Sequence, residues 1–284
     1  MKKSIVLAAD IGGSHITSAL VNMAECRIIP GSVFRAHVDA NGSAASIIDS
    51  WSRIMQHSME EGGGADCLGI AMPGPFNYEE GVSLIQGLHK YEALYGLNIK
   101  KLLADSLHMP AAQIRIANDA SCFLQGELFC GAARGRRNVL GLTLGTGFGS
   151  AIAENGIAVE AAYWNTPFLS SRAEDHFSSR WFLQRYKELS GKEESGVKQI
   201  ALLAIESEAA KAVFSEFGSN LAVFLQEQAF KPSVVILGGN IAHAFHLFIA
   251  TLEKGLPDTR FILSALGEEA PLLGAAGFWE IAAY

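Results

Sequence analysis

One sequence pattern constrains the fold more than any other because it occurs twice. An apolar run meets a glycine-rich turn and a second apolar run follows, first over residues 5–21 and again over residues 139–153. Each copy is typical of a β-hairpin, and each turn holds more glycine than packing alone requires. Two such hairpins about half a chain apart predict a duplicated architecture in which each half opens with a hairpin.

The segments outside the two hairpins alternate between strand and helix patterns. Short buried strands are expected over residues 67–72, 114–117 and 234–237. Apolar spacing predicts helices over residues 45–61, 99–107, 120–129, 176–190, 197–211, 212–229, 241–252 and 271–281. This alternation indicates an α/β protein. A chain of 284 residues, 49% of them hydrophobic, is long enough for one large domain or two lobes. Since no linker separates the halves, we expect closely packed lobes with a cleft between them.

Composition and charge exclude several classes of protein. Lys and Arg number 22 against 29 Asp and Glu, and the formal charge of −7 argues against a nucleic-acid or membrane-surface partner. The apolar run after Lys2 and Lys3 stops at Asp10, too early for a signal peptide, and no run approaches the roughly 20 apolar residues of a membrane span. The four cysteines show no C-x-x-C spacing, which disfavours disulfides and a zinc knuckle. We therefore expect a cytoplasmic protein.

Both glycine-rich turns are candidate phosphate cradles. Asp10 ends the first strand, and Gly12, Gly13 and Ser14 follow it. Small residues let backbone N–H groups approach an anion, a Ser hydroxyl adds a donor, and an acid at the strand end is suited to hold Mg²⁺ through water. The second turn, residues 145–149, is neither a Walker loop nor a G-x-G-x-x-G segment that opens a helix. The alternative for each turn is a plain glycine-rich hairpin.

Polar residues at two strand ends are further candidates. Asn118 and Asp119 follow a strand, where an Asp can accept a proton from a substrate hydroxyl and an Asn can bind a neighbouring one. The alternative is an N-cap for the next helix, and the two roles are compatible. Residues 238–240, Gly-Gly-Asn, can lie against a flat ring or a phosphate, or can simply start a helix. Residues 174–176, Glu-Asp-His, fit a helix start better than a catalytic trio.

These segments, taken in order, carry a resemblance that spans nearly the whole chain. They are residues 10–14 (DIGGS), 73–75 (PGP), 118–120 (NDA), 126–127 (GE), 131–133 (GAA), 144–149 (LGTGFG), 238–240 (GGN) and 273–276 (LGAA). The set resembles the ROK family of sugar kinases, which have the two-lobed α/β actin-like ATPase (ribonuclease H-like) fold. The resemblance implies an N-terminal lobe over residues 1–117, joined by a C-terminal helix over 271–284, and a nucleotide-binding lobe over 118–270.

The resemblance also implies roles for individual residues. Asp119 matches the catalytic base, Asn118 and Gly74 match sugar-binding positions, and Asp10 matches the acid near Mg–ATP. The positions that match nucleotide-binding segments are Asp10, Gly12, Gly13, Ser14, Gly145, Thr146, Gly147, Gly238, Gly239 and Asn240. The implied activity is therefore phosphoryl transfer from ATP, with Mg²⁺, to a sugar hydroxyl. A homodimer is compatible with the resemblance.

The chain also departs from the family pattern. The zinc motif C-x-C-G-x-x-G-C is absent, so the chain looks like a zinc-lacking branch. Residues 160–168 replace the segment that usually supplies a sugar-binding glutamate. Alignment places that glutamate on Ala162, and Glu160 substitutes for it only if the loop shifts. Ser14 and His15 replace the commoner Thr-Lys, which removes a charge near the phosphate.

We therefore expect an ATP-dependent kinase of a hexose or N-acetylhexosamine, glucokinase-like, with Asp119 as general base. One alternative is a non-catalytic sugar-binding sensor of the same fold, which the altered segment over residues 160–168 leaves open. A further alternative is an actin-like ATPase or acetate-kinase relative that acts on a non-sugar substrate.

Overall fold

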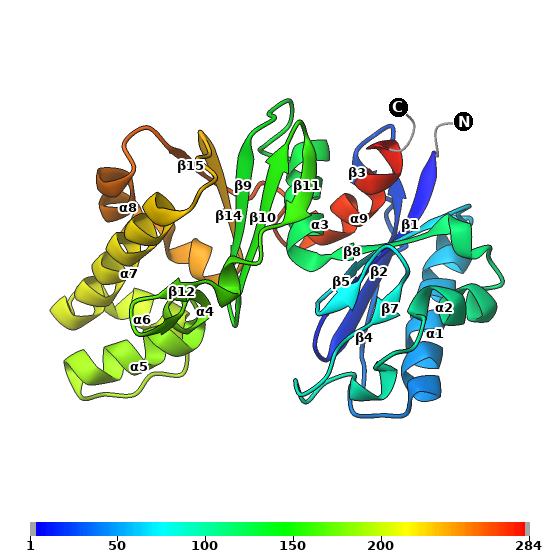
Figure 1. The fold of residues 1–284 in the computed structure, drawn as a ribbon, viewed down its shortest axis with the longest axis horizontal. Coiled ribbons are helices and arrows are strands. Elements are labelled where there is room, and N and C mark those ends of the chain that lie inside the picture. The colour runs from blue at the N-terminus through cyan, green and yellow to red at the C-terminus, as the bar shows by residue number, and fades with distance from the viewer. Residues whose placement is uncertain (1–3, 282–284) are drawn as a thin grey trace. The chain divides into compact units, whose positions relative to one another are not determined.

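The computed structural model describes residues 4–281, which form two compact units (Figure 1). The first unit comprises residues 1–134 and 269–284, and the second comprises residues 135–268. The first unit therefore includes residues 118–134, which the family resemblance assigns to the other lobe. Residues 1–3 and 282–284, the charged start and the end of the expected C-terminal helix, lie outside the described residues.

The first unit is built on a mixed sheet whose strand order is β3-β2-β1-β5-β8, with β4 also paired to β2. Its strands are β1 (Ile5–Ile11), β2 (His15–Asn22), β3 (Arg27–Ile28), β4 (Phe34–His37), β5 (Leu68–Met72) and β8 (Ile114–Asn118). The hairpin β1–β2 is antiparallel, whereas β1, β5 and β8 run parallel. In register, Asp10 pairs with Ala71, and Met72 pairs with Asn118. The carboxyl ends of these three strands thus meet at one edge of the sheet, where α/β proteins place ligands.

Helices cover both faces of this sheet. They are α1 (Ala44–Gly62), α2 (Ile99–Leu107), α3 (Asp119–Phe129) and α9 (Ala270–Ile281), with short 3₁₀ turns η1 (Glu92–Leu94) and η2 (Ala111–Gln113) and a small hairpin of β6 (Phe76–Asn77) and β7 (Val82–Ser83). One face of the sheet shares a core with α1 and α2 that contains Trp51, Met55 and Leu103. On the other face, Ala71 of β5 packs with Cys122 of α3 and Ala275 of α9.

Helices α3 and α9 pack with their backbones in close approach, although about 140 residues separate them in the sequence (Figure 1). A Cβ atom on Gly126 would overlap the carbonyl oxygen of Ala270, and one on Gly274 would overlap the carbonyl oxygen of Cys122. Only glycine permits this contact. The contact explains why α3 belongs to the first unit.

The second unit repeats the same plan. Its sheet has the order β11-β10-β9-β14-β15, in which β9, β10 and β11 form an antiparallel meander and β14 runs parallel to both β9 and β15. The strands are β9 (Val139–Leu144), β10 (Phe148–Glu154), β11 (Ile157–Glu160), β14 (Val234–Gly238) and β15 (Arg260–Leu263). A small separate hairpin joins β12 (Pro167–Phe168) to β13 (Ser171–Arg172). The shared strand order confirms the predicted duplication of the hairpin architecture.

The second unit contains the helices α4 (Ala173–His176), α5 (Ser179–Ser190), α6 (Val197–Leu203), α7 (Glu208–Glu227) and α8 (Ile249–Gly255), with 3₁₀ segments η3 (Tyr163–Asn165) and η4 (Asn240–Leu247).

These helices differ from the predicted ones at three places. The predicted helix over 176–190 begins only at residue 179. The predicted boundary at 211–212 is wrong, because Ser207 accepts a hydrogen bond from the backbone of Ala210 and caps α7 there. The predicted helix over 241–252 is instead η4, interrupted at Ala244, followed by α8.

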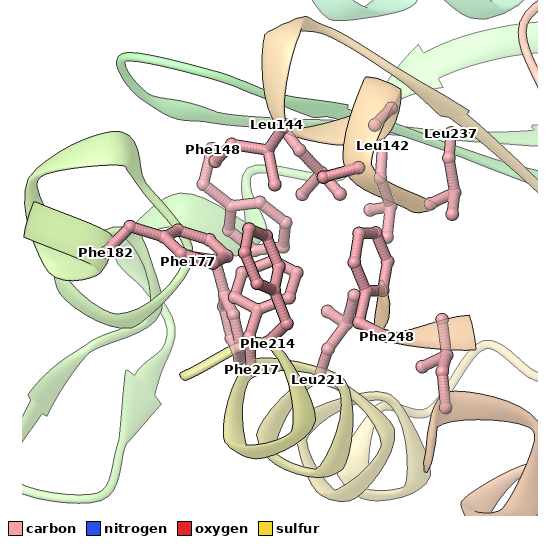
Figure 2. Close-up of a cluster of buried hydrophobic side chains, with 14 of the residues drawn as sticks. Leu142, Leu144, Phe148, Phe177, Phe182, Phe214, Phe217, Leu221, Leu237 and Phe248 are labelled. Carbon is pink, nitrogen blue, oxygen red and sulfur yellow. The ribbon is translucent and has the colours of Figure 1, made fainter. Parts of the chain in front are cut away.

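The core of the second unit is rich in aromatic rings (Figure 2). Phe148 begins β10, and its ring lies 5.1 Å from that of Phe177. Phe217 of α7 in turn packs against Phe182 of α5 and Phe248, with ring centroids 4.8 and 5.2 Å apart. Because Phe148 directly follows residues 145–147 of the second glycine-rich turn, this buried cluster fixes one end of that turn.

Candidate active site

In the first unit, two carboxylates lie near the same buried thiol. Asp10 is near the end of β1, and Asp119 is the first residue of α3, directly after β8. Cys122, one turn further along α3, is fully buried. Burial raises the pKa of its thiol well above the ordinary value, and the charges of Asp10 and Asp119 raise it further. The parallel strands thus bring together the two acids that the sequence singles out.

Asn118 caps the helix that carries Asp119. Its Oδ1 accepts a hydrogen bond from the backbone of Ser121 at 3.1 Å, which confirms the N-cap interpretation. Its Nδ2 donates to the hydroxyl of Tyr78 at 3.3 Å, and that hydroxyl donates to the carbonyl of Met72 at 3.1 Å. The Asn118 side chain also hydrogen-bonds the carboxyl group of Asp119, so the cap leaves one lone pair of Oδ1 for a ligand. The capping and binding roles are therefore compatible, as expected.

Asp119 combines exposure with an altered acidity. Its side chain is exposed, so a substrate can reach the carboxylate. The surrounding protein nevertheless desolvates the group and raises its pKa. The backbone N–H of Ala120, which donates to Oδ1 at 2.9 Å, and the ammonium of Lys90 act in the opposite direction. A carboxylate with a raised pKa is a stronger base than a solvated one, as general-base catalysis requires.

The Gly12–Gly13–Ser14 turn joins β1 to β2 and is exposed. A Cβ atom on Gly12 would lie 3.6 Å from the carbonyl oxygen of His15, which is an ordinary contact. A Cβ atom on Gly13 would lie 3.8 Å from Cδ of Lys90, also an ordinary contact, and neither glycine has a positive φ. Neither packing nor backbone conformation therefore requires glycine here. This favours a ligand that approaches the backbone closely over a plain hairpin turn.

The turn at residues 145–147 is held by side chains of α4 and α5. Ser179 donates two hydrogen bonds to the carbonyl of Gly145, from its backbone at 2.8 Å and from Oγ at 2.9 Å. A Cβ atom on Gly145 would extend into open space, with no other residue within 4 Å, whereas one on Gly147 would lie 2.9 Å from Oε2 of Glu174. That oxygen also accepts a hydrogen bond from the backbone of Phe148 at 3.3 Å. Thr146, between the two glycines, is exposed.

Glu174 is a site residue for which the sequence indicated only a helix start. It lies in the first turn of α4, as expected, but its carboxylate reaches the glycine-rich turn. Arg172 and Arg180 flank Oε1 at 4.0 and 3.7 Å. A carboxylate and two guanidinium groups therefore lie beside this turn.

The segment at residues 238–240 packs against the end of β9. Gly238 pairs with Thr143, and Gly239 has a φ of +83°. A Cβ atom on Gly239 would come within 2.8 Å of the backbone nitrogen of Leu144. A turn at the start of η4 is therefore sufficient reason for this glycine. The structure nevertheless places residues 238–240 beside the strand that leads into Gly145.

Two of the expected sugar-binding residues lie in different units. Gly74 follows β5, and a Cβ atom on it would lie 3.1 Å from the hydroxyl of Tyr78, which is the partner of Asn118. Glu160 ends the edge strand β11, is exposed, and pairs with Ala151. Within the described residues 4–281, no three His, Cys, Asp or Glu side chains gather in a way that would hold a metal ion. In the same part of the chain, no helix has the length and apolar character of a membrane span.

The duplicated sheets and the glycine-rich hairpins define a two-lobed actin-like ATPase fold. A solved structure described as a ROK family glucokinase from Streptomyces griseus in complex with glucose and AMPPNP has this fold, with a TM-score of 0.75 and 22% identity over 96% of this chain and 98% of the other. The ROK family pattern matches residues 6–162, more than half of the sequence. The chain belongs to the ROK family.

Named relatives cover most of the chain. The N-acetyl-D-glucosamine kinase of Haemophilus influenzae is 25% identical over 277 residues, which span 87% of this chain and 88% of the relative. The glucokinase of Thermotoga maritima is 25% identical over 321 aligned positions, which span 97% of each chain. Both of these relatives are named as sugar kinases.

Proposed function

We propose that this protein is an ATP-dependent kinase that phosphorylates a hydroxyl group of a hexose or an N-acetylhexosamine. The observation that carries the proposal is Asp119, an exposed carboxylate with a raised pKa at the end of β8, which acts on the same buried thiol as Asp10 near the end of β1. The relatives named as kinases of glucose and N-acetylglucosamine support the choice of substrate class.

In the proposed reaction, Asp119 accepts the proton of the sugar hydroxyl. The hydroxyl oxygen forms a bond to the terminal phosphorus of ATP, while the bond from that phosphorus to the bridging oxygen breaks and ADP leaves. Asn118 and Gly74 would position the sugar beside Asp119. Because the transferring group carries most of its charge on oxygen, binding and charge neutralisation provide most of the catalysis.

The residues of the first unit fit a magnesium ion. Asp10 supplies a half-buried carboxylate at a strand end, and a second carboxylate, Asp119, lies near the same thiol. Such oxygen donors are those that Mg²⁺ prefers, and it usually keeps several waters. When bound, the ion would neutralise phosphate charge. Asp10 would hold it, through water, next to the turn at Gly12–Ser14.

The remaining nucleotide contacts would come from backbone that is exposed or half-buried, except at Gly238, which is buried. In the first unit they are proposed at Gly12, Gly13 and Ser14. In the second they are proposed at Gly145, Thr146, Gly147, Gly238, Gly239 and Asn240. Added Cβ atoms would make only ordinary contacts at Gly12 and Gly13 and would enter open space at Gly145, which supports close approach by a phosphate because nothing else there requires glycine.

We further propose that the enzyme contains no zinc and that Glu160 takes part in sugar binding. The absence of the cysteine motif supports the first point. The exposure of Glu160 at the end of β11 supports the second. Metal analysis of the purified protein and the KM for sugar of Glu160→Gln test the two points separately.

The test of the function is ADP release with Mg–ATP across a panel of hexoses, N-acetylhexosamines and their epimers. Turnover is expected with one or a few of these sugars. In Asp119→Asn, kcat should fall by about 10²–10⁴-fold, the range for loss of a general base, while ATP affinity stays nearly unchanged. The matched control is Asp105→Asn, because Asp105 is an exposed acid on α2 of the same unit.

Two other outcomes are informative. An unchanged kcat in Asp119→Asn would refute the assignment of the base while leaving the kinase intact. If the wild type released no ADP with any sugar of the panel but still bound a sugar in calorimetry, the result would instead indicate the sugar-binding sensor.

A further inference from the structure

Lys90 lies beside both the glycine turn and the proposed base, and no sequence motif marks it. It precedes η1, and its half-buried side chain reaches the turn, where Cδ lies 3.8 Å from the position that a Cβ atom on Gly13 would take. Its ammonium is also close enough to Asp119 to influence that carboxyl group electrostatically. A single cation thus lies near both the turn and the base.

Among residues 4–281, the ammonium of Lys90 takes part in no hydrogen bond and no ion pair, and its charge acts on Asp119 from beyond ion-pair distance. Lys100 offers a contrast, because its Nζ donates to the carbonyl of Glu79 at 2.8 Å. Lysine is a strongly hydrated point charge that commonly binds phosphate, and a partly buried ammonium beside an open turn suits an anionic ligand.

The segment that carries Lys90 is anchored to the same turn. The next residue, Tyr91, is fully buried, and its hydroxyl donates to the carbonyl of Gly12 at 2.7 Å. Its backbone N–H donates to Ala40 at 2.7 Å, and its ring lies edge-on against Trp51 at 5.3 Å. Burial raises the pKa of Tyr91 to about 12, so the hydroxyl remains a donor at neutral pH. The backbone of Lys90 is therefore held in place relative to the turn, which favours preorganised binding.

The side chain of His15, which is next to the turn in the sequence, is engaged by two neighbours. Its ring forms a 2.9 Å hydrogen bond with the hydroxyl of Ser14 and packs edge-on against His37, with centroids 5.3 Å apart. The sequence implied a missing charge at position 15. In the structure the side chain of Lys90, from a distant part of the sequence, lies on the turn instead.

We propose that Lys90 binds the terminal phosphoryl group of the nucleotide donor and neutralises its charge during transfer, between the Gly13 backbone and Asp119. This inference rests on the proposed kinase function. In it, Lys90 donates a hydrogen bond to a non-bridging phosphoryl oxygen and keeps its own proton. Placing a fixed cation where charge develops is a major source of catalysis in phosphoryl transfer.

The test compares Lys90→Met, which keeps the apolar stem, with Lys101→Met, an exposed lysine on α2 of the same unit. We expect kcat with Mg–ATP to fall by about 10- to 100-fold in Lys90→Met, as for loss of a charged hydrogen bond. The KM for the sugar should change little, and Lys101→Met should behave as the wild type. Lys90→Arg should recover part of the rate, and so should His15→Lys added to Lys90→Met.

A pH profile separates binding of phosphate from a merely structural role. Because the positive charge of Lys90 lowers the pKa of Asp119, the acid limb of kcat/KM should move to higher pH in Lys90→Met. Circular dichroism checks that the variant folds, and Lys90→Gln serves as a second variant. An active wild type with Lys90→Met and Lys90→Gln as fast as Lys101→Met would overturn the role of Lys90 and leave the kinase function standing.

If the wild type phosphorylates no sugar, the kinase function fails and the anion site is tested by itself. Calorimetric titration with tripolyphosphate should then show at least roughly tenfold weaker binding in Lys90→Met than in the wild type. Equal affinity in the two proteins would overturn the inference.

Discussion

Replacement of Gly274 by alanine tests the close approach of α3 and α9. An added methyl group would overlap the carbonyl oxygen of Cys122 and would lie 2.6 Å from its carbon and 2.7 Å from the nitrogen of Gly126. All of these are backbone atoms, so no side chain can rotate away to relieve the overlap. The two helices must separate, and α3 carries Asp119 at its first position.

The size of the effect follows from two opposing terms. Overpacking a well-packed interface costs about 1–3 kcal/mol, and a clash between backbones belongs at the upper end, about 3 kcal/mol. Replacing glycine by alanine within a helix stabilises the folded state by about 1 kcal/mol. The free energy of unfolding of the first unit should therefore fall by about 2 kcal/mol. For a unit of this size the melting temperature should fall by roughly 4–8 °C.

The matched control is Gly277→Ala in the same helix. There the nearest atoms belong to the side chain of Phe129, at 3.2 Å, and a ring can shift. Its stability should change by less than about 1 kcal/mol, because the gain in helix propensity offsets a mild contact. Urea denaturation, together with amide exchange in α3 and α9, measures both variants. A Gly274→Ala protein as stable as Gly277→Ala would refute the packing described for these helices.

Two further predictions concern the pH dependence and the second core. The raised pKa of Asp119 means that the folded state binds its proton more tightly than the unfolded state, so this group destabilises the fold as pH rises from about 4 through the folded pKa. The urea midpoint of Asp119→Asn should therefore exceed that of the wild type at pH 7.5 by more than at pH 4, and an equal difference at both values would contradict the shift. Phe217→Ala should destabilise the second unit by about 3–5 kcal/mol, because the ring is fully buried. On the same helix, Val223→Ala should cost less than about 0.5 kcal/mol, because Val223 is 46% exposed. A comparable loss in both would show that the aromatic cluster is not the source of stability.

The sheets could be predicted from sequence because their signals are local. The hairpins at residues 5–21 and 139–153 combine apolar runs with glycine-rich turns, and the structure has strands on both sides of each turn. The helix boundary near residue 207 escapes prediction because apolar spacing continues across it. The capping serine there is the available signal. The interrupted 3₁₀ course of residues 240–247 depends on tertiary packing, which local spacing does not encode.

The same distinction holds for the site. Asp10 and Asp119 stand out because each lies near the end of a strand, and parallel pairing then brings such ends together. Lys90 has no such signal, because its position depends on how Tyr91 is buried against the turn at Gly12. Glu174 shows an intermediate case. Its place at a helix start is visible in the sequence, but its contact with the backbone of Phe148 requires the three-dimensional fold.

Cys122 gives the protein a built-in chemical reporter. Its thiol is fully buried where α3 meets α9, and burial and two neighbouring carboxylates keep it protonated. Only a thiolate attacks an alkylating reagent, so this sulfur stays unreactive while the two helices remain packed. Its labelling rate therefore measures how often α9 separates from α3. A substrate that slowed the labelling would show how strongly binding at Asp119 stabilises the packing of α3 against α9.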